Sequence, residues 1–144
     1  ERGCELRFLE LMPVGYGAKI FDDLFVDAAS VQDAIASCYE LTPLLGELSE
    51  SAVRYRAVRS DGTEGVVGFI SPCTNPFCSG CSRLRLTADG RLIGCLARED
   101  GVLIRDLPKD VSGAAVAKTV RDALQGKRSD HLFEQHRLMA AIGG

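Results

Sequence analysis

Apolar and polar residues alternate in several short stretches of this chain, and each stretch predicts a β-strand. Residues 4–11 mix apolar and charged positions in a way that suits a strand with both faces partly covered. Residues 53–58 and 66–70 indicate two further strands, and Ser-Asp-Gly-Thr at residues 60–63 is a hairpin signal between them. A second hairpin is expected over residues 83–95. Together these segments predict one antiparallel sheet of about four strands.

Apolar residues at helical spacing predict two helices, so the fold class is α+β. Residues 31–40 follow Ser30, which we expect to cap this helix, with Asp33 completing a capping box. A loop over residues 12–17 precedes it, and the second helix is expected over residues 112–126. The apolar stripe of the first helix is formed by Val31, Ala34, Ile35 and Cys38.

The composition is that of a folded domain: 46% of the 144 residues are hydrophobic and 26% are charged. No apolar run approaches the roughly 20 residues that a membrane span needs. The net charge of −3 provides no basic surface for a nucleic acid. We therefore expect neither a membrane nor a nucleic-acid partner.

Six cysteines and no secretory signal favour a reducing, cytoplasmic setting over a disulfide-bonded secreted protein. The chain also starts at Glu1 and enters a strand three residues later, whereas natural domains usually begin with a looser end. We therefore expect a carboxyl-terminal portion of a larger protein.

Three of the cysteines follow a ligand-like spacing, C-x2-C-x13-C, formed by Cys78, Cys81 and Cys95. A turn centred near Asp89 would return the chain so that Cys95 lies opposite residues 83–84, next to the other two cysteines. A [4Fe-4S] cluster held by three thiolates leaves one iron open. A structural zinc site needs a fourth ligand. Cys73, His131 or His136 would supply it, and unrelated thiols or a disulfide are the remaining alternatives.

Arg83 and Arg85 stand two residues apart on a predicted strand, so their side chains leave on one face. Two guanidinium groups on one face suit a triphosphate, because each binds phosphate oxygens in a bidentate manner. Two solvated arginines on an exposed sheet are the simpler alternative, and the neighbouring cysteines favour the anion site.

Residues 68–96 have the sequence G-F-I-S-P-C-T-N-P-F-C-S-G-C-S-R-L-R-L-T-A-D-G-R-L-I-G-C-L. Together with Arg-Phe-Leu-Glu-Leu-Met at residues 7–12 and the final Gly143-Gly144, this resembles the C-terminal domain of the MoaA family. These are radical-SAM GTP 3′,8-cyclases of molybdenum-cofactor biosynthesis. Ser82 and Gly94 depart from the usual Asn and Pro of the family. The amino-terminal C-x3-C-x2-C of the family is absent from this chain, so the chain alone is predicted to be inactive.

The resemblance implies that residues 1–17 are the last strand of a partial (βα) radical-SAM barrel and its loop. Residues 18–144 would then be a cluster- and GTP-binding domain, a small antiparallel sheet with flanking helices. The missing N-terminal radical-SAM barrel domain would bind SAM and a second [4Fe-4S] cluster. There SAM would yield the 5′-deoxyadenosyl radical, which abstracts a hydrogen atom from the GTP ribose. Ring closure onto guanine C8 then gives the nucleotide that becomes precursor Z. A homodimer is also expected, because removing the barrel leaves the first strand uncovered.

The resemblance also assigns residues. Cys78, Cys81 and Cys95 would hold a [4Fe-4S] cluster whose open iron faces the guanine of GTP. Arg83, Leu84 and Arg85 would contact GTP, and Met12 would line the SAM adenine. Gly143 and Gly144 would form a catalytic tail. Arg7 remains a candidate for an anion.

Two other functions stay open at this point. A zinc-ribbon-like binding module would use the same cysteines without redox chemistry. A purely structural or dimerising piece would leave the site empty or form disulfides.

Overall fold

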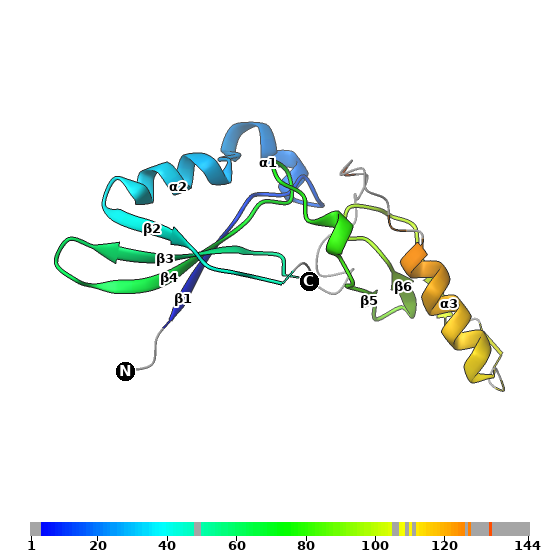
Figure 1. Ribbon diagram of the computed structural model, residues 1–144. Coiled ribbons are helices and arrows are strands. Elements are labelled where there is room, and N and C mark those ends of the chain that lie inside the picture. The colour runs from blue at the N-terminus through cyan, green and yellow to red at the C-terminus, as the bar shows by residue number, and fades with distance from the viewer. Residues whose placement is uncertain are drawn as a thin grey trace. The chain divides into compact units, whose positions relative to one another are not determined.

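The computed structural model describes residues 4–47, 50–104, 107–108, 110, 112–125, 127 and 133. The chain is mixed α+β, as predicted (Figure 1). No helix in the described part is long and apolar enough to cross a membrane. The elements are β1 Glu5–Leu9, α1 Gly17–Leu24, α2 Ala28–Ala36, β2 Tyr39–Pro43, β3 Val53–Arg59, β4 Glu64–Ile70, the 3-10 turn η1 Cys78–Gly80, β5 Arg85–Leu86, β6 Arg91–Ile93, β7 Val102–Leu103 and α3 Gly113–Gln125.

Two units divide the chain. The first unit contains residues 1–11 and 22–81, and the second unit contains residues 12–21 and 82–144. Both cysteines of the C-x2-C pair belong to the first unit, and Cys95 belongs to the second.

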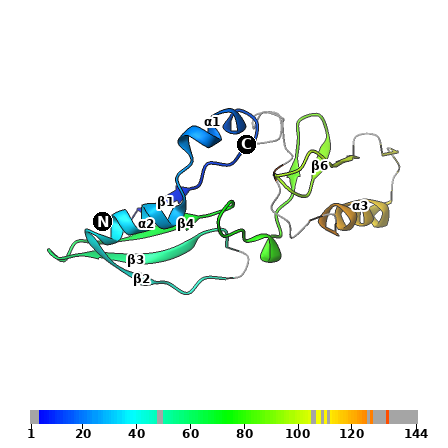
Figure 2. The same cartoon turned by 90° about the horizontal axis from the view of Figure 1, so that it is seen from above.

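A four-stranded mixed sheet in the order β1-β4-β3-β2 forms the first unit, and α2 packs on one of its faces (Figure 2). The strand β1 runs parallel to β4 and places Phe8 opposite Phe69, and the two rings stack with centroids 5.8 Å apart. Val31 and Ile35 of α2 pack against the buried residues under the helix, as the predicted stripe requires. The buried centre of this core is Ala57, Val67 and Phe69.

The prediction of a single antiparallel sheet was wrong. The cysteine hairpin belongs to a separate three-stranded sheet, in the order β5-β6-β7, and β1 joins the other sheet by a parallel pairing. The alternation within a strand sets which residues share a face, but it does not identify the partner strand. The pairing of β1 with β4 is long-range, so no local pattern could reveal it.

The predicted boundaries of the first helix were also wrong. Asp27, not Ser30, caps α2, and its carboxylate accepts a 2.7 Å hydrogen bond from the Ser30 backbone N–H. The helix ends at Ala36 because the next residues form β2, whose Tyr39 pairs with Arg59 of β3. Cys38, which we expected on the buried stripe, lies beyond the helix and is exposed. The helix α1 was not predicted.

In the second unit, β5 and β6 form the predicted hairpin. The Thr87 N–H donates to Arg91 O at 2.9 Å and the Gly90 N–H donates to Thr87 O at 3.0 Å. Gly90 has a φ of +80°, a left-handed conformation that glycine adopts without strain. The strand β7 pairs with the outer side of β6. The turn chemistry at residues 88–90 therefore places the hairpin where the sequence predicted it.

The helix α3 begins as predicted, because the Ser112 hydroxyl accepts from the Ala115 N–H at 3.3 Å. Its last turns pack so closely on the end of the hairpin that a Cβ at Gly94 would overlap Ala123 O. Glycine is therefore required at position 94 for this close approach. The core of the second unit is formed by Val14 and Ile93, with Met12, Leu96 and Phe133 packed around them.

Candidate functional site

The C-x2-C pair lies on a single turn of 3-10 helix in the first unit. The Cys81 N–H donates to Cys78 O at 3.2 Å and closes the turn. Cys78 is the first residue of this turn, and Cys81 caps its end in an extended conformation. The turn therefore brings the backbones of the two predicted thiolate ligands close together.

Cys95 follows directly from β6 in the second unit. The pairing of β5 with β6 places Arg85 opposite Ile93 and Leu86 opposite Leu92. Arg85 and Ile93 are the last paired residues at the open end of the hairpin, so the predicted place of Cys95 opposite residues 83–84 is compatible with this register and stays a prediction. Cys95 also lies between two residues of the core of the second unit, Ile93 and Leu96. The fold therefore fixes its backbone on both sides.

The convergence of the three cysteines stays a prediction. In the part of the chain that the structure describes, no group of three or more His, Cys, Asp or Glu residues is arranged to hold a metal ion. The donor set itself fits an iron–sulfur cluster, because thiolates are the usual ligands of such clusters. All six cysteines are thiols rather than disulfides.

Cys73, the candidate fourth ligand of a zinc site, has other contacts. Its Sγ donates to Leu11 O at 3.4 Å. Burial raises the pKa of the Cys73 thiol to about 11, and the negative charge of Glu10 adds to this effect. A metal ligand must be a thiolate, so this environment disfavours Cys73 as a ligand. The other two candidates, His131 and His136, lie outside the described residues.

The predicted GTP residues lie at the start of the hairpin in the second unit. Arg85 is half-buried within β5, and Arg83 is exposed in the segment that leads into it. The Lys127 ammonium donates to the carbonyl oxygen of Arg83. Sequence reasoning missed this contact, which joins the residue after α3 to the backbone at the start of the hairpin.

Met12, predicted to line the SAM adenine, packs against the core cluster of Val14 and Ile93. The structure therefore brings Met12 to the strand that leads into Cys95. Arg7 lies on β1 in the first unit, where its Nε donates to Glu5 Oε1 at 2.6 Å. Gly143 and Gly144 lie outside the described residues, so their catalytic role stays a prediction.

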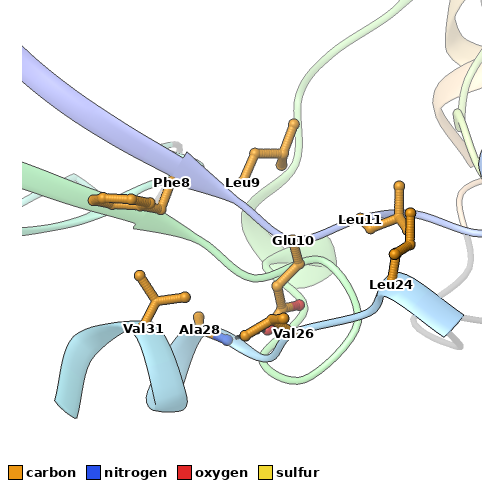
Figure 3. Close-up of a pocket in the computed structure, with 8 residues that line it drawn as sticks. All are labelled: Phe8, Leu9, Glu10, Leu11, Leu24, Val26, Ala28 and Val31. Carbon is orange, nitrogen blue, oxygen red and sulfur yellow. Dashed lines mark hydrogen bonds between the residues drawn. The ribbon is translucent and has the colours of Figure 1, made fainter. Parts of the chain in front are cut away.

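Glu10 is a buried carboxylate that sequence reasoning did not single out, and it is 4% exposed. It lies directly after β1 and lines a cavity of about 190 Å³ that is otherwise apolar (Figure 3). Its Oε1 accepts from the Ala28 N–H at 3.0 Å and from the Thr74 hydroxyl. Its Oε2 accepts from the backbone N–H groups of Cys73 and Thr74 at 3.0 and 3.1 Å.

The protonation of Glu10 reflects a balance of two effects. Burial acts to raise its pKa, but the hydrogen bonds from Thr74, Ala28 and Cys73 outweigh it, and the net pKa is lowered. The group is therefore a carboxylate at neutral pH. A glutamate flanked by two leucines at the end of a strand is the sequence signal that points to it.

The chain is similar to known proteins over most of its length. Residues 4–133 match the family described as Molybdenum Cofactor Synthesis C. The GTP 3′,8-cyclase of Moorella thermoacetica is 36% identical over 150 aligned positions, which cover 100% of this chain and 45% of that protein. The protein of the same name from Clostridium botulinum strain Okra is 33% identical, over 96% of this chain and 43% of its own. That of Synechocystis is 38% identical over 71% of this chain and 30% of its own. The chain thus spans less than half the length of these relatives.

Proposed function

The chain belongs to the Molybdenum Cofactor Synthesis C family, and from this premise we propose that it is the carboxyl-terminal part of a GTP 3′,8-cyclase. Such an enzyme, a radical-SAM lyase, converts GTP to 3′,8-cyclo-7,8-dihydro-GTP in the first step of molybdopterin biosynthesis. The observation that carries the proposal is the family match over residues 4–133, which includes every predicted cluster ligand and GTP contact. The amino-terminal radical-SAM barrel of the whole protein would supply the SAM chemistry.

In this proposal Cys78, Cys81 and Cys95 hold a [4Fe-4S] cluster. When bound, the cluster supplies an open iron that acts as a Lewis acid toward a guanine nitrogen. Arg83 and Arg85 bind the triphosphate, with the main chain of Leu84 between them. Holding the substrate in one geometry lowers the reaction barrier by about 7–11 kcal/mol in well-oriented cases.

The other residues position the reactants. Lys127 holds the carbonyl oxygen of Arg83 and so steadies the strand that carries the guanidinium groups. Met12 packs beside the same hairpin and lines the SAM adenine. The Gly143-Gly144 tail enters the active site. SAM and a second [4Fe-4S] cluster belong to the barrel domain, which is a required partner of this chain.

We further propose a cytoplasmic location and a homodimer. The six unbridged thiols support a reducing compartment. The large apolar side chains exposed on and near β1 support self-association. The second candidate function, a zinc-ribbon-like module, is less favoured. Its candidate fourth ligand, Cys73, donates a hydrogen bond to Leu11 O, and the pKa of its thiol is raised.

Metal and sulfide analysis of anaerobically purified protein tests the proposal. After reconstitution with iron and sulfide, we expect about four irons and four sulfides per chain, and a spectrum that changes when GTP is added. Replacing Cys95 by serine should abolish iron retention, whereas Cys38→Ser, an exposed cysteine outside the motif, should leave it unchanged. One zinc per chain and no sulfide would establish the zinc-ribbon function instead.

A further inference from the structure

Glu10 ties together three segments of the first unit that are far apart in the sequence. It follows β1, accepts from the Ala28 N–H at the start of α2, and accepts three hydrogen bonds from Cys73 and Thr74. A fourth hydrogen bond joins the same two segments, because the Cys73 thiol donates to Leu11 O, directly after Glu10. The end of β1 and residues 73–74 are therefore held together from both sides.

The segment that Glu10 holds leads directly to the C-x2-C pair. Residues 71–75 form a turn in which the Asn75 N–H donates to Ser71 O at 3.0 Å. Three residues after Asn75 the chain enters η1, where Cys78 and Cys81 lie on one turn. Residues 71–81 contain no strand, and the hydrogen bonds to Glu10 anchor the first part of this loop to the end of β1.

The hydrogen bonds that anchor this loop are made to an ionised carboxylate. Hydrogen bonds to an ionised group are about twice as strong as neutral ones. A buried carboxylate left without its donors is costly, so the contacts persist as a set. Three of the four donors to the carboxylate are backbone N–H groups, which do not depend on side-chain rotamers, and the fourth is the Thr74 hydroxyl. The loop is thus fixed at its backbone.

We propose that Glu10 is a positioning residue that sets where Cys78 and Cys81 are presented. It does so by holding the backbone of residues 73–74 against the end of β1. The proposal rests on the proposed function only in that the cysteine pair holds a cluster; the anchoring of the loop stands independently of it. Glu10 itself touches neither the cluster ligands nor the substrate residues in the described contacts.

The test compares Glu10→Gln with Glu64→Gln, which makes the same chemical change in an exposed ion pair with Arg56 on the same sheet. A second pair of variants, Thr74→Val and Thr74→Ser, removes or keeps the hydroxyl that reaches Glu10. In cluster-free protein, alkylation of each cysteine is followed by peptide mass spectrometry, with exposed Cys38 as the internal reference. Hydrogen exchange of residues 71–81 is measured alongside.

Glu10→Gln and Thr74→Val should raise the alkylation rates of Cys78 and Cys81 by about tenfold, because a lost charged hydrogen bond frees the loop. Thr74→Ser should restore the slow rates, and Glu64→Gln should match the wild type. In reconstituted protein, the first two variants should lose iron to a chelator about tenfold faster and show an altered spectrum of the reduced cluster.

A merely structural role would lower the unfolding midpoint of Glu10→Gln while leaving alkylation, hydrogen exchange and cluster spectrum unchanged, and that result would overturn the proposal. If the wild type takes up no cluster, the proposed function fails. The alkylation and exchange measurements on cluster-free protein still decide whether Glu10 positions the loop. If Glu10→Gln does not fold, Thr74→Val and Thr74→Ser give the same comparison without changing charge.

Discussion

At the end of β1, Glu10 and Cys73 lie together and hold opposite protonation states. The carboxylate is ionised because its hydrogen bonds outweigh the effect of burial, and the thiol keeps its proton because of burial and the nearby negative charge. The cysteines and paired arginines could be named as candidates from sequence because their spacing is local, and their roles stay predictions. The role of Glu10 could not, because its partners lie 18 to 64 residues away.

The raised pKa of Cys73 gives a prediction for its reactivity. Since only the thiolate attacks an alkylating agent, a thiol with a pKa of about 11 should react slowly at pH 8 and accelerate up to about pH 11. Exposed Cys38 serves as the control in the same protein. We expect its labelling to be at least about tenfold faster at pH 8. Equal labelling of both cysteines across this pH range would show that Cys73 is not held as a buried thiol.

At the scale of elements, local chemistry decided which predictions succeeded. The hairpin of β5 and β6 was predicted because the turn residues and the alternation lie within one short stretch. The partner of β1 was not predicted, and neither was β2, whose first two residues fall within the predicted helix of residues 31–40. Strand pairing across the sheet depends on tertiary contacts that outweigh local propensity. The predicted position of Cys95 opposite residues 83–84 lies beyond the last paired residues of this hairpin and stays a prediction.

The packing of α3 on the hairpin gives a prediction at Gly94. An alanine Cβ there would overlap Ala123 O, so Gly94→Ala should force the helix away and lower the free energy of unfolding by about 1–3 kcal/mol. Gly113→Ala is the matched control, because a Cβ at the first residue of α3 meets nothing within 4 Å. Chemical denaturation of the wild type and both variants measures the change in the free energy of unfolding. The close approach of α3 is refuted if both alanines have the same small effect.

At the scale of the whole chain, large apolar side chains remain exposed on and near β1. Leu9 is 55% exposed and Leu24 is 61% exposed, and both line the cavity beside Glu10 (Figure 3). Within the described residues, β1 pairs on one side only, with β4. A strand edge without a partner pairs readily with another chain. The fold class, the family and an uncovered first strand could be predicted from the sequence, but the particular side chains exposed there could not, because burial is a property of the folded molecule.

These exposed leucines predict that the chain self-associates reversibly. Each fully buried leucine contributes about 1.5–3 kcal/mol, so replacing Leu9 and Leu24 by lysine should weaken the dimer at least about tenfold. Sedimentation velocity over a range of protein concentrations measures the dissociation constant of the dimer. Leu45→Lys is the control, because Leu45 is fully exposed but follows β2, at the opposite edge of the sheet from β1. It should associate like the wild type, since Leu45 lies away from the exposed Leu9 and Leu24. A wild-type chain that stays monomeric at every concentration would show that the exposed leucines do not drive association.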